Sequence, residues 1–137
     1  MSSELEEGGS IPVDYTCYQS DYSYRARTLS LPLEWTNVPI GTVSFILVMS
    51  DLDVPYGIGA DGNQTSWHWG LYNIGGESTR SDSFIVDPDG QEILGLGNTT
   101  NDFSKSGLFP PCPQYGTHRY RYTIYALDVG FEDGIVD

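Results

Sequence analysis

A chain of 137 residues is large enough for one domain, and its net charge of −13 argues against binding to nucleic acids and anionic membranes, which attract basic surfaces. Charged residues make up 18% of the chain and aromatic residues 13%, with sixteen glycines and eight prolines, a composition typical of a loop-rich β protein. No apolar run approaches the roughly 20 residues of a membrane-spanning helix. We expect a flexible acidic tail over residues 1–10 and a single domain over residues 11–137. Because no cationic, apolar leader is visible, a cytoplasmic location is expected.

The two cysteines, Cys17 and Cys112, lie far apart in the sequence. Their spacing fits neither a zinc knuckle nor a C-x-x-C redox pair. The favoured interpretation is two buried thiols in a reducing compartment. The alternative is a disulfide that ties the N-terminal segment to a late loop.

The first part of the chain is predicted to contain short extended segments. Residues 11–16, I-P-V-D-Y-T, favour a short strand at the edge of a sheet, because a proline near the start removes a backbone donor. Residues 29–35, L-S-L-P-L-E-W, are also expected to be extended, with an interruption at Pro32. Residues 36–41 contain a proline and a glycine and predict a turn.

A buried strand and an acidic corner follow. Residues 43–49, V-S-F-I-L-V-M, form an apolar run typical of a buried strand, which is expected to stop at Asp51. The next residues spell D-L-D-V-P, with Asp51 and Asp53 ahead of Pro55. Carboxylates at the mouth of a buried strand mark a candidate site in a sheet protein. They can equally serve a structural purpose, by accepting hydrogen bonds from the amides of a tight turn.

Two later segments alternate between apolar and polar residues and each carries one of the two histidines. In residues 67–74, alternation places Trp67, Trp69 and Leu71 on one face and His68, Gly70 and Tyr72 on the other. In residues 117–127, the shared face carries His118, Tyr120, Tyr122, Ile124 and Ala126. Each histidine is thus expected to lie in a strand with a tyrosine on its own face.

The remaining segments are predicted to be short strands and loops. Residues 84–86 suggest a short strand, and residues 94–106 suggest a long loop, which in a compact domain tends to be functional. Residues 107–116 contain three prolines in four positions, so they exclude a helix or a central strand. No amphipathic helix and no internal repeat is evident in the sequence.

Three kinds of chemistry could use the aspartates and histidines. Carboxylates that accept hydrogen bonds from imidazoles raise the imidazole pKa, and the charged rings can then bind a phosphate or carboxylate. A divalent metal is disfavoured because no H-x-H or H-x-x-x-H spacing exists, so no metal and no cofactor is expected. A nucleophilic triad is also disfavoured, because no G-x-S-x-G elbow is present.

Taken in order, these segments resemble the phosphatidylethanolamine-binding protein family, in its compact bacterial and archaeal branch. The similarity runs from about residue 11 to residue 128. The matching segments are I-P-V-D-Y-T-C at 11–17, L-P-L-E-W-T-N-V-P-I-G-T-V-S-F at 31–45, D-L-D-V-P at 51–55, W-H-W-G-L-Y-N-I at 67–74, N-D-F-S-K-S-G at 101–107, P-P-C-P at 110–113 and T-H-R-Y-R-Y-T-I-Y-A-L-D at 117–128.

The resemblance implies a mainly β fold, in which a large central antiparallel sheet packs against a smaller one with few short helices. It also implies a small anion pocket near one edge of the molecule, with a loop over residues 107–111 as a wall or a source of backbone amides. Two features depart from the family pattern, namely Leu52 and Val54 in the acidic corner and residues 108–110 at the lip. The implied ligand-binding residues are Asp51, Asp53, Pro55, His68, Gly107, Pro110, Pro111, His118 and Tyr120.

The leading functional hypothesis is a non-enzymatic protein that binds phosphate, a phospholipid headgroup or a similar small anion in this pocket. The resemblance also implies a regulatory role through protein contacts, either on a kinase or as an inhibitor of a serine carboxypeptidase or other serine protease. A third hypothesis is a small lyase, isomerase or cyclase that uses the Asp and His residues as general acid and base.

Overall fold

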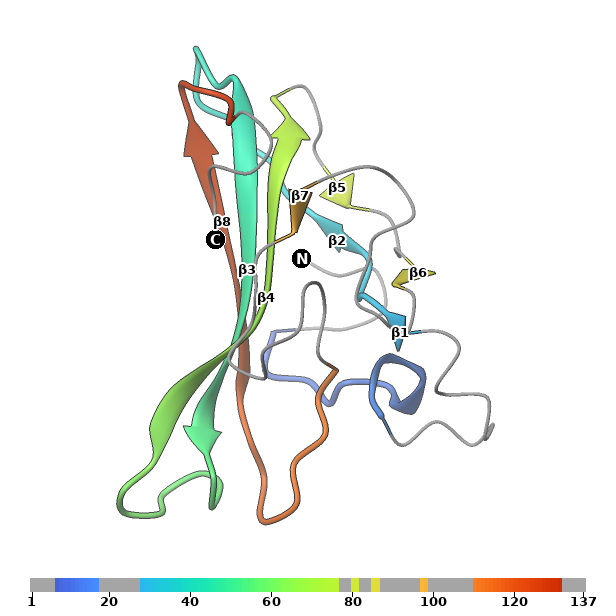
Figure 1. The fold of residues 1–137 in the computed structure, drawn as a ribbon, viewed down its shortest axis with the longest axis vertical. Coiled ribbons are helices and arrows are strands. Elements are labelled where there is room, and N and C mark those ends of the chain that lie inside the picture. Colours follow the sequence, from blue (N-terminus) through green and yellow to red (C-terminus); the bar gives the residue numbers. More distant parts are fainter. Residues whose placement is uncertain are drawn as a thin grey trace.

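The structure is a computed structural model that describes residues 7–17, 28–76, 80–81, 85–86, 97–98 and 110–131. The described residues are mainly strands, with one short 3-10 turn and no α-helix (Figure 1). This confirms the mainly β fold. The elements are η1 (Val13–Tyr15), β1 (Thr28–Leu29), β2 (Leu33–Glu34), β3 (Ser44–Val54), β4 (Gln64–Gly75), β5 (Arg80–Ser81), β6 (Ile85–Val86), β7 (Gly97–Asn98) and β8 (Tyr120–Leu127).

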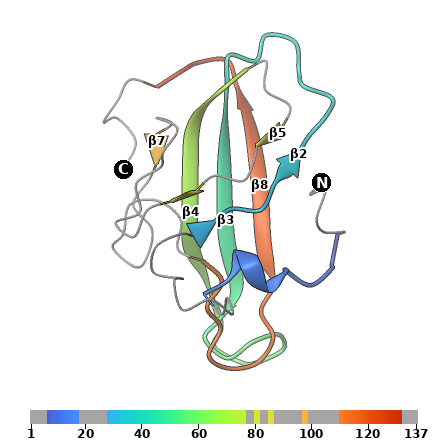
Figure 2. The ribbon, with the colours of Figure 1, turned by 90° about the vertical axis from the view of Figure 1, so that its right-hand side faces the viewer.

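The strands form one long antiparallel sheet and two short ribbons. The long sheet has the order β7-β4-β3-β8, and the ribbons pair β1 with β6 and β2 with β5. Both ribbons lie on the same side of the long sheet (Figures 1 and 2). A large sheet covered by smaller ones is the expected arrangement.

The core lies between the long sheet and the ribbons. Leu47 and Met49 of β3 are 2% and 0% exposed, and their partners on β4, Leu71 and Trp69, are fully buried in the same apolar cluster. From the layer of the ribbons, Trp35 meets the ring of Phe45 edge-on, with ring centroids 5.3 Å apart. Both histidine-bearing segments therefore adjoin a packed apolar layer.

A bulge in β4 changes the predicted faces of this strand. Met49 pairs with Trp69, but Ser50 pairs with Trp67, so His68 is the extra residue on β4. A β-bulge redirects side chains and interrupts strict alternation. The prediction that Trp67 and Trp69 share a face is therefore wrong, because the bulge places them on opposite faces.

Three predicted boundaries also need correction. The segment after Pro12 forms the 3-10 turn η1 instead of an edge strand, because the fixed φ of proline, here −59°, suits the start of a helical turn. β3 does not stop at Asp51 but continues to Val54, paired on both sides for most of its length. β8 begins at Tyr120, so His118 lies just before the strand and not within it.

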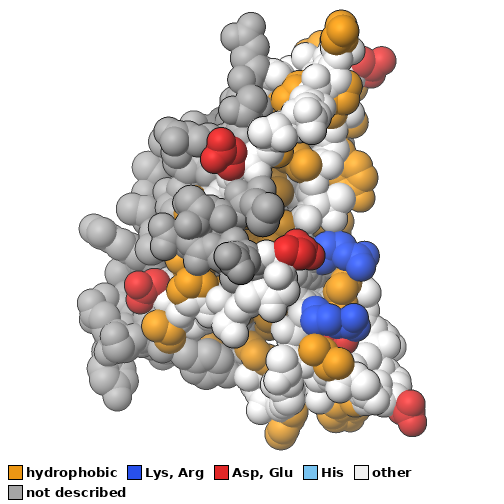
Figure 3. Space-filling model, turned by 180° about the vertical axis from the view of Figure 1, so that it is seen from behind, with side chains coloured by type: hydrophobic (Ala, Val, Ile, Leu, Met, Phe, Trp, Pro, Cys, Tyr) orange, Lys and Arg blue, Asp and Glu red, His pale blue; other side chains and the backbone are white. Residues whose placement is uncertain are grey.

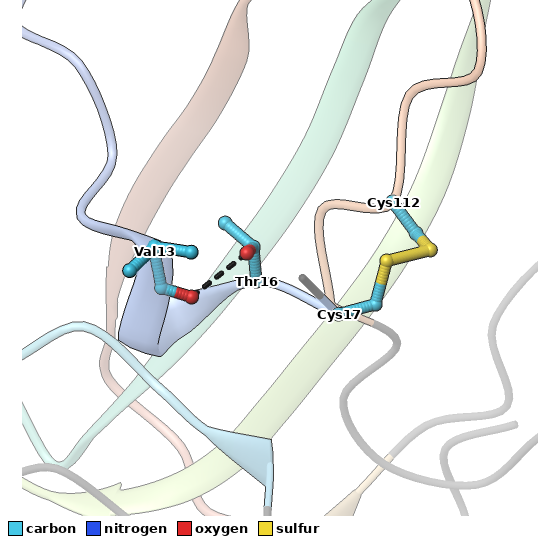
Figure 4. Close-up of a disulfide and its surroundings, with 4 residues drawn as sticks. All are labelled: Val13, Thr16, Cys17 and Cys112. Atoms are coloured by element: carbon cyan, nitrogen blue, oxygen red, sulfur yellow. Dashed lines mark hydrogen bonds between the residues drawn. A yellow bond between two sulfur atoms is a disulfide. The ribbon is translucent and has the colours of Figure 1, made fainter. Parts of the chain in front are cut away.

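A disulfide joins Cys17 to Cys112, with the two Cα atoms 5.3 Å apart (Figure 4). Beside it, Cys17 N donates to Pro111 O at 3.1 Å, and Thr16 Oγ1 donates to Val13 O at 2.8 Å. The favoured interpretation of two free thiols is therefore wrong. Spacing alone could not show this, because 95 positions separate the cysteines and only the fold brings them together.

The cellular location stays a prediction. Disulfides are typical of oxidising compartments, so the Cys17–Cys112 bond weighs against the cytoplasmic location expected from the N-terminal sequence. Within the described residues, no helix has the length and apolar character needed to cross a membrane.

Candidate functional site

The two aspartates of the acidic corner lie near the end of β3 and are both buried. The carboxylate of Asp51 accepts the backbone N–H of Asp53 at Oδ1 (2.9 Å). Its other oxygen, Oδ2, accepts a hydrogen bond from His118 Nδ1 at 2.7 Å. Asp51 therefore both shapes the corner and connects β3 to the segment before β8.

Asp53 forms a forked ion pair with Arg119. Arg119 Nε and Nη2 donate to the two carboxylate oxygens at 3.0 and 2.8 Å, and the Arg119 backbone N–H donates at 2.7 Å. The side-chain hydrogen bonds from Arg119 lower the pKa of Asp53 to about 2, although burial opposes this shift. The carboxylate of Asp53 is thus charged and occupied within the protein.

The imidazole of His118 has an acceptor at each ring nitrogen. Nδ1 donates to Asp51, and Nε2 faces the backbone carbonyl of Tyr115 at 2.9 Å. Burial alone would lower the pKa of His118, but the hydrogen bonds to Asp51 and Tyr115 and the negative charges of Asp51 and Asp53 raise it overall. Both nitrogens can donate at once only in the protonated ring, so the site favours an imidazolium.

Close contact between two loops places His118. Gly57 N donates to Asp53 O at 2.9 Å, which closes the turn after β3, and Ile58 N donates to Thr117 O at 2.7 Å, which joins this turn to the loop before β8. A Cβ on Gly57 would lie 2.9 Å from Thr117 N, and one on Gly116 would lie 2.5 Å from Tyr56 O. Because both glycines also have positive φ, other residues would force these loops apart.

The rings of His68, Tyr120 and His118 lie side by side. Tyr120 meets His68 edge-on with ring centroids 5.5 Å apart, and it stacks on His118 at 6.5 Å with an interplanar angle of 21°. Tyr120 also pairs with Asp51 across β3 and β8. The strand register thus brings both histidines and one of the carboxylates to a single tyrosine.

A cavity of about 890 Å³ opens beside this cluster. Of the predicted ligand-binding residues, Pro111, His118 and Tyr120 lie on its wall, together with Arg119. Asp51, Asp53 and His68 lie behind the wall, buried next to the lining residues. Pro55, which is joined to Val54 by a cis peptide bond, does not line the cavity, nor does Pro110. Gly107 lies outside the described residues.

The described part of the proline loop can form a wall but supplies few donors. Pro110, Pro111 and Pro113 have no backbone N–H, so within residues 110–113 only Cys112 has an amide hydrogen. Within the described residues, no group of three His, Cys, Asp or Glu side chains is arranged to hold a metal ion.

Sequence reasoning missed the contributions of Arg119 and Tyr115. Strict alternation predicts Arg119 on the face opposite His118, yet its backbone and side chain both reach Asp53. The alternation does not apply there because β8 starts one residue later. The carbonyl of Tyr115 carries no sequence signal at all, since any residue supplies one.

The comparison with known families decides the classification. The model of the family described as phosphatidylethanolamine-binding protein matches residues 1–134 of the chain. The chain belongs to this family. The resemblance seen in the sequence motifs is thereby confirmed for the family, while the ligand-binding role of each residue stays a prediction.

Relatives within the phosphatidylethanolamine-binding protein family cover nearly the whole chain. A UPF0098 protein of Aquifex aeolicus is 34% identical over 132 residues, which are 94% of this chain and 67% of the relative. The UPF0098 protein YbhB of Escherichia coli is 31% identical over 135 residues, covering 94% of this chain and 77% of YbhB.

Solved structures of the family have the same fold. CT736 of Chlamydia trachomatis, described as a homologue of phosphatidylethanolamine-binding protein, has a TM-score of 0.74 at 28% identity. That comparison covers 96% of this chain and 76% of CT736. Escherichia coli YbcL has a TM-score of 0.70 at 25% identity, covering 100% of this chain and 80% of YbcL.

We expect His118 to titrate above the usual imidazole value of about 6.5, and Asp51→Asn to bring its pKa down. A raised pKa in the folded state means that the contribution of His118 to stability is complete below about pH 6.5 and is lost as the pH rises through the folded-state value. NMR titration of the imidazole signals measures this pKa. Asparagine keeps the Oδ1 acceptor for Asp53 N, so the corner stays capped. A wild-type His118 that titrates at or below 6.5 would contradict the assignment.

Proposed function

We propose that this member of the phosphatidylethanolamine-binding protein family binds a small anion, either phosphate or a phosphorylated headgroup, in the cavity beside His118 and Tyr120. The observation that carries the proposal is the cluster of His68, Tyr120 and His118 around Asp51. The phenol hydroxyl of Tyr120 is a suitable hydrogen-bond donor for a compact anion, and an imidazolium beside it adds positive charge.

The cavity is lined by the acidic side chains of Glu7 and Glu34 and by Arg119 and Arg121, and the charges next to the His118–Tyr120 cluster support an anionic ligand. Asp51 and Asp53 each have a cationic partner, His118 and Arg119, so neither carboxylate presents an uncompensated negative charge. The side chain of Arg119 is 60% exposed and lines the cavity, whereas that of Asp53 is 3% exposed. An entering anion would therefore meet the guanidinium of Arg119 before the carboxylate of Asp53.

The geometry also refines the roles expected from the sequence. Because both ring nitrogens of His118 already face acceptors, His118 contributes positive charge and holds Tyr120, and we do not assign it a direct hydrogen bond to the ligand. Asp51 and Asp53 are positioning residues that fix His118 and Arg119. Tyr120 and Arg119 are the residues that we assign to direct contact.

Relatives support the ligand class without identifying the ligand. The family is named for binding phosphatidylethanolamine, whose headgroup is a phosphate joined to ethanolamine. Inorganic phosphate and phosphorylethanolamine share the anionic part, so a cavity that recognises that part should bind both.

The test is an NMR titration of the protein with inorganic phosphate, phosphorylethanolamine and ethanolamine, followed by the imidazole signals of His68 and His118. We expect both phosphate compounds to shift these signals and ethanolamine to leave them unchanged. Tyr120→Phe keeps the ring but removes the hydroxyl, so it should weaken phosphate binding about tenfold or more, as expected for a hydrogen bond to a charged group.

Tyr125→Phe is the matched control, because Tyr125 is an exposed tyrosine of the same strand on the opposite face. This variant should bind phosphate like the wild type. Imidazole signals that do not move at millimolar phosphate, or equal affinities of wild type and Tyr120→Phe, would remove the basis of the proposal.

A further inference from the structure

Residues 113–116 form a short segment next to the cavity that is anchored at both ends. Before the segment, Cys112 is held by its disulfide to Cys17. After it, the carbonyl of Thr117 accepts the backbone N–H of Ile58 at 2.7 Å. The first and last residues of the segment line the cavity. A local change in these residues would therefore alter the cavity wall while the long sheet stays folded.

The carbonyl of Tyr115, inside this segment, receives a hydrogen bond from His118. Nε2 of the ring faces Tyr115 O at 2.9 Å, while Nδ1 faces Asp51 Oδ2 at 2.7 Å. A carbonyl and an ionised carboxylate can only accept hydrogen bonds, so both ring nitrogens must donate. The two contacts therefore exist together only when the ring is protonated.

Loss of one proton from the ring must break one of these two contacts. The bond to Asp51 should survive, because Asp51 is charged and 3% exposed, whereas Tyr115 is 64% exposed and its carbonyl can be hydrated. The N–H bond at Nε2 then breaks, its electron pair stays on the nitrogen, and the proton goes to water. The lone pair of Nε2 would now face the oxygen of Tyr115, and two acceptors at this distance repel each other.

We propose that His118 is a proton-dependent switch that controls the order of residues 113–116. The imidazolium holds the Tyr115 carbonyl and keeps the segment in place. The neutral imidazole releases this carbonyl and remains bonded to Asp51, so this part of the cavity wall becomes mobile. The inference goes beyond anion binding and does not rest on it, because the segment can be followed in the protein without a ligand.

Charged and titratable groups surround His118 on three strands of the long sheet. They are Asp51 and Asp53 of β3, Arg119 and Tyr120 at the start of β8, and His68 of β4 behind Tyr120. Burial alone would lower the pKa of His118, but the hydrogen bonds at both ring nitrogens and the charges of Asp51 and Asp53 raise it. Arg119 opposes this only weakly, because it is paired with Asp53 and 60% exposed, and basic side chains lie at the surface of the molecule (Figure 3). We therefore expect the change in order above about pH 6.5, the usual imidazole value.

The cavity also carries charges that do not contact His118. Glu7, Glu34 and Arg121 line its wall, and within the described residues no hydrogen bond or ion pair joins them to the ring. Because these charges include both signs, their effects on the ring partly cancel. The contacts with Asp51 and Tyr115 thus remain the direct controls of the switch.

The test follows the isotopically labelled protein without ligand by NMR, across the titration of His118. The ring nitrogen shifts report its protonation and tautomer, and backbone order parameters of Tyr115 and Gly116 report the mobility of the segment. We expect order parameters of about 0.85 for the imidazolium form, falling below about 0.6 with the same midpoint as the ring. The neutral ring should carry its proton at Nδ1. The amide of Ile58 should stay protected from exchange, because its bond to Thr117 O is not released.

Asp51→Asn separates the switch from a merely structural role of Asp51. Asparagine keeps the Oδ1 acceptor for Asp53 N and places an N–H donor opposite Nδ1 of the ring. A neutral ring then accepts at Nδ1, carries its proton at Nε2 and stays bonded to Tyr115 O. The order parameters of Tyr115 and Gly116 should therefore remain high at every pH in this variant.

Tyr115→Phe is the matched control, because it removes the phenol and keeps the backbone carbonyl. This variant should show the same change in order and the same midpoint as the wild type. Four results would overturn the proposal: order parameters that do not follow the ring titration, a neutral wild-type ring protonated at Nε2, an Asp51→Asn segment that loosens with rising pH, and a Tyr115→Phe variant without the pH response.

Discussion

Replacing Cys17 and Cys112 together by serine is expected to lower the free energy of unfolding by about 4 kcal/mol. The reason is the entropy of the unfolded chain, because a cross-link between residues 95 positions apart closes a long loop and excludes many unfolded conformations. The bond also holds the 3-10 turn and the proline loop together, and both adjoin the cavity that contains His118. Urea unfolding of the wild type and the double variant measures the difference.

A reducing agent provides the control for the double-serine variant. Reduction should lower the stability of the wild type to near that of the double variant and leave the variant itself unchanged. Equal stability of oxidised wild type, reduced wild type and variant would contradict the role assigned to the disulfide. Reduction could also weaken phosphate binding. In that case residues 110–113 would transmit the effect of the disulfide to the cavity, because Cys17 N donates a hydrogen bond to Pro111 O and Pro111 lines the cavity.

The second large effect is expected from Asp53→Asn, which should lower the free energy of unfolding by about 2 kcal/mol. Asparagine has the shape of aspartate but loses the charge and one acceptor, so the backbone N–H and the guanidinium of Arg119 compete for a single oxygen. The cost is smaller than for a fully buried ion pair, because the Arg119 side chain is 60% exposed and can be hydrated.

The same variant makes a specific prediction about acid. In the folded protein, the pKa of Asp53 is lowered from its ordinary value of 3.8 to about 2. The contribution of Asp53 to the stability of the fold is therefore complete above about pH 3.8 and is lost as the pH falls toward 2. The difference between wild type and Asp53→Asn should therefore narrow across this range. A difference that stays constant from pH 6 to pH 2 would show that Asp53 does not act through its charge. Arg119→Lys is the matched variant, since it keeps the cation but loses the forked geometry.

Much of the central sheet is predictable from local sequence. The apolar run at residues 43–49 and the alternation over residues 117–127 predict β3 and β8, because a strand buried by its neighbours must have such patterns. The observed register confirms that Tyr120, Tyr122 and Ile124 face the core, opposite Asp51, Met49 and Leu47.

The errors arise where a single residue or a distant partner decides the structure. The bulge at His68 follows from the strand register, which an alternating sequence does not reveal. The 3-10 turn after Pro12 ends at Tyr15, and Cys17, two residues later, is held by a disulfide to a loop 95 positions away. Local propensity contains no information about either constraint.

The candidate site shows the same division. The D-L-D-V-P corner and the H-R-Y segment identify the site, and the structure brings Asp51, Asp53, His118 and Tyr120 together. How the four are connected depends on backbone groups, such as the Tyr115 carbonyl, and on the glycine contact between residues 57 and 116. These contacts are the reason why we propose that the aspartates position His118 and Arg119 rather than contact a ligand.

The most direct test of the proposed function is a crystal structure of this chain with phosphorylethanolamine. We predict that the phosphate lies in the cavity within hydrogen-bond distance of Tyr120 Oη or the Arg119 guanidinium. We also predict that Asp51 remains bonded to His118 and Asp53 to Arg119. A phosphate bound away from this cavity, or a cavity that stays empty at saturating ligand, would contradict the account.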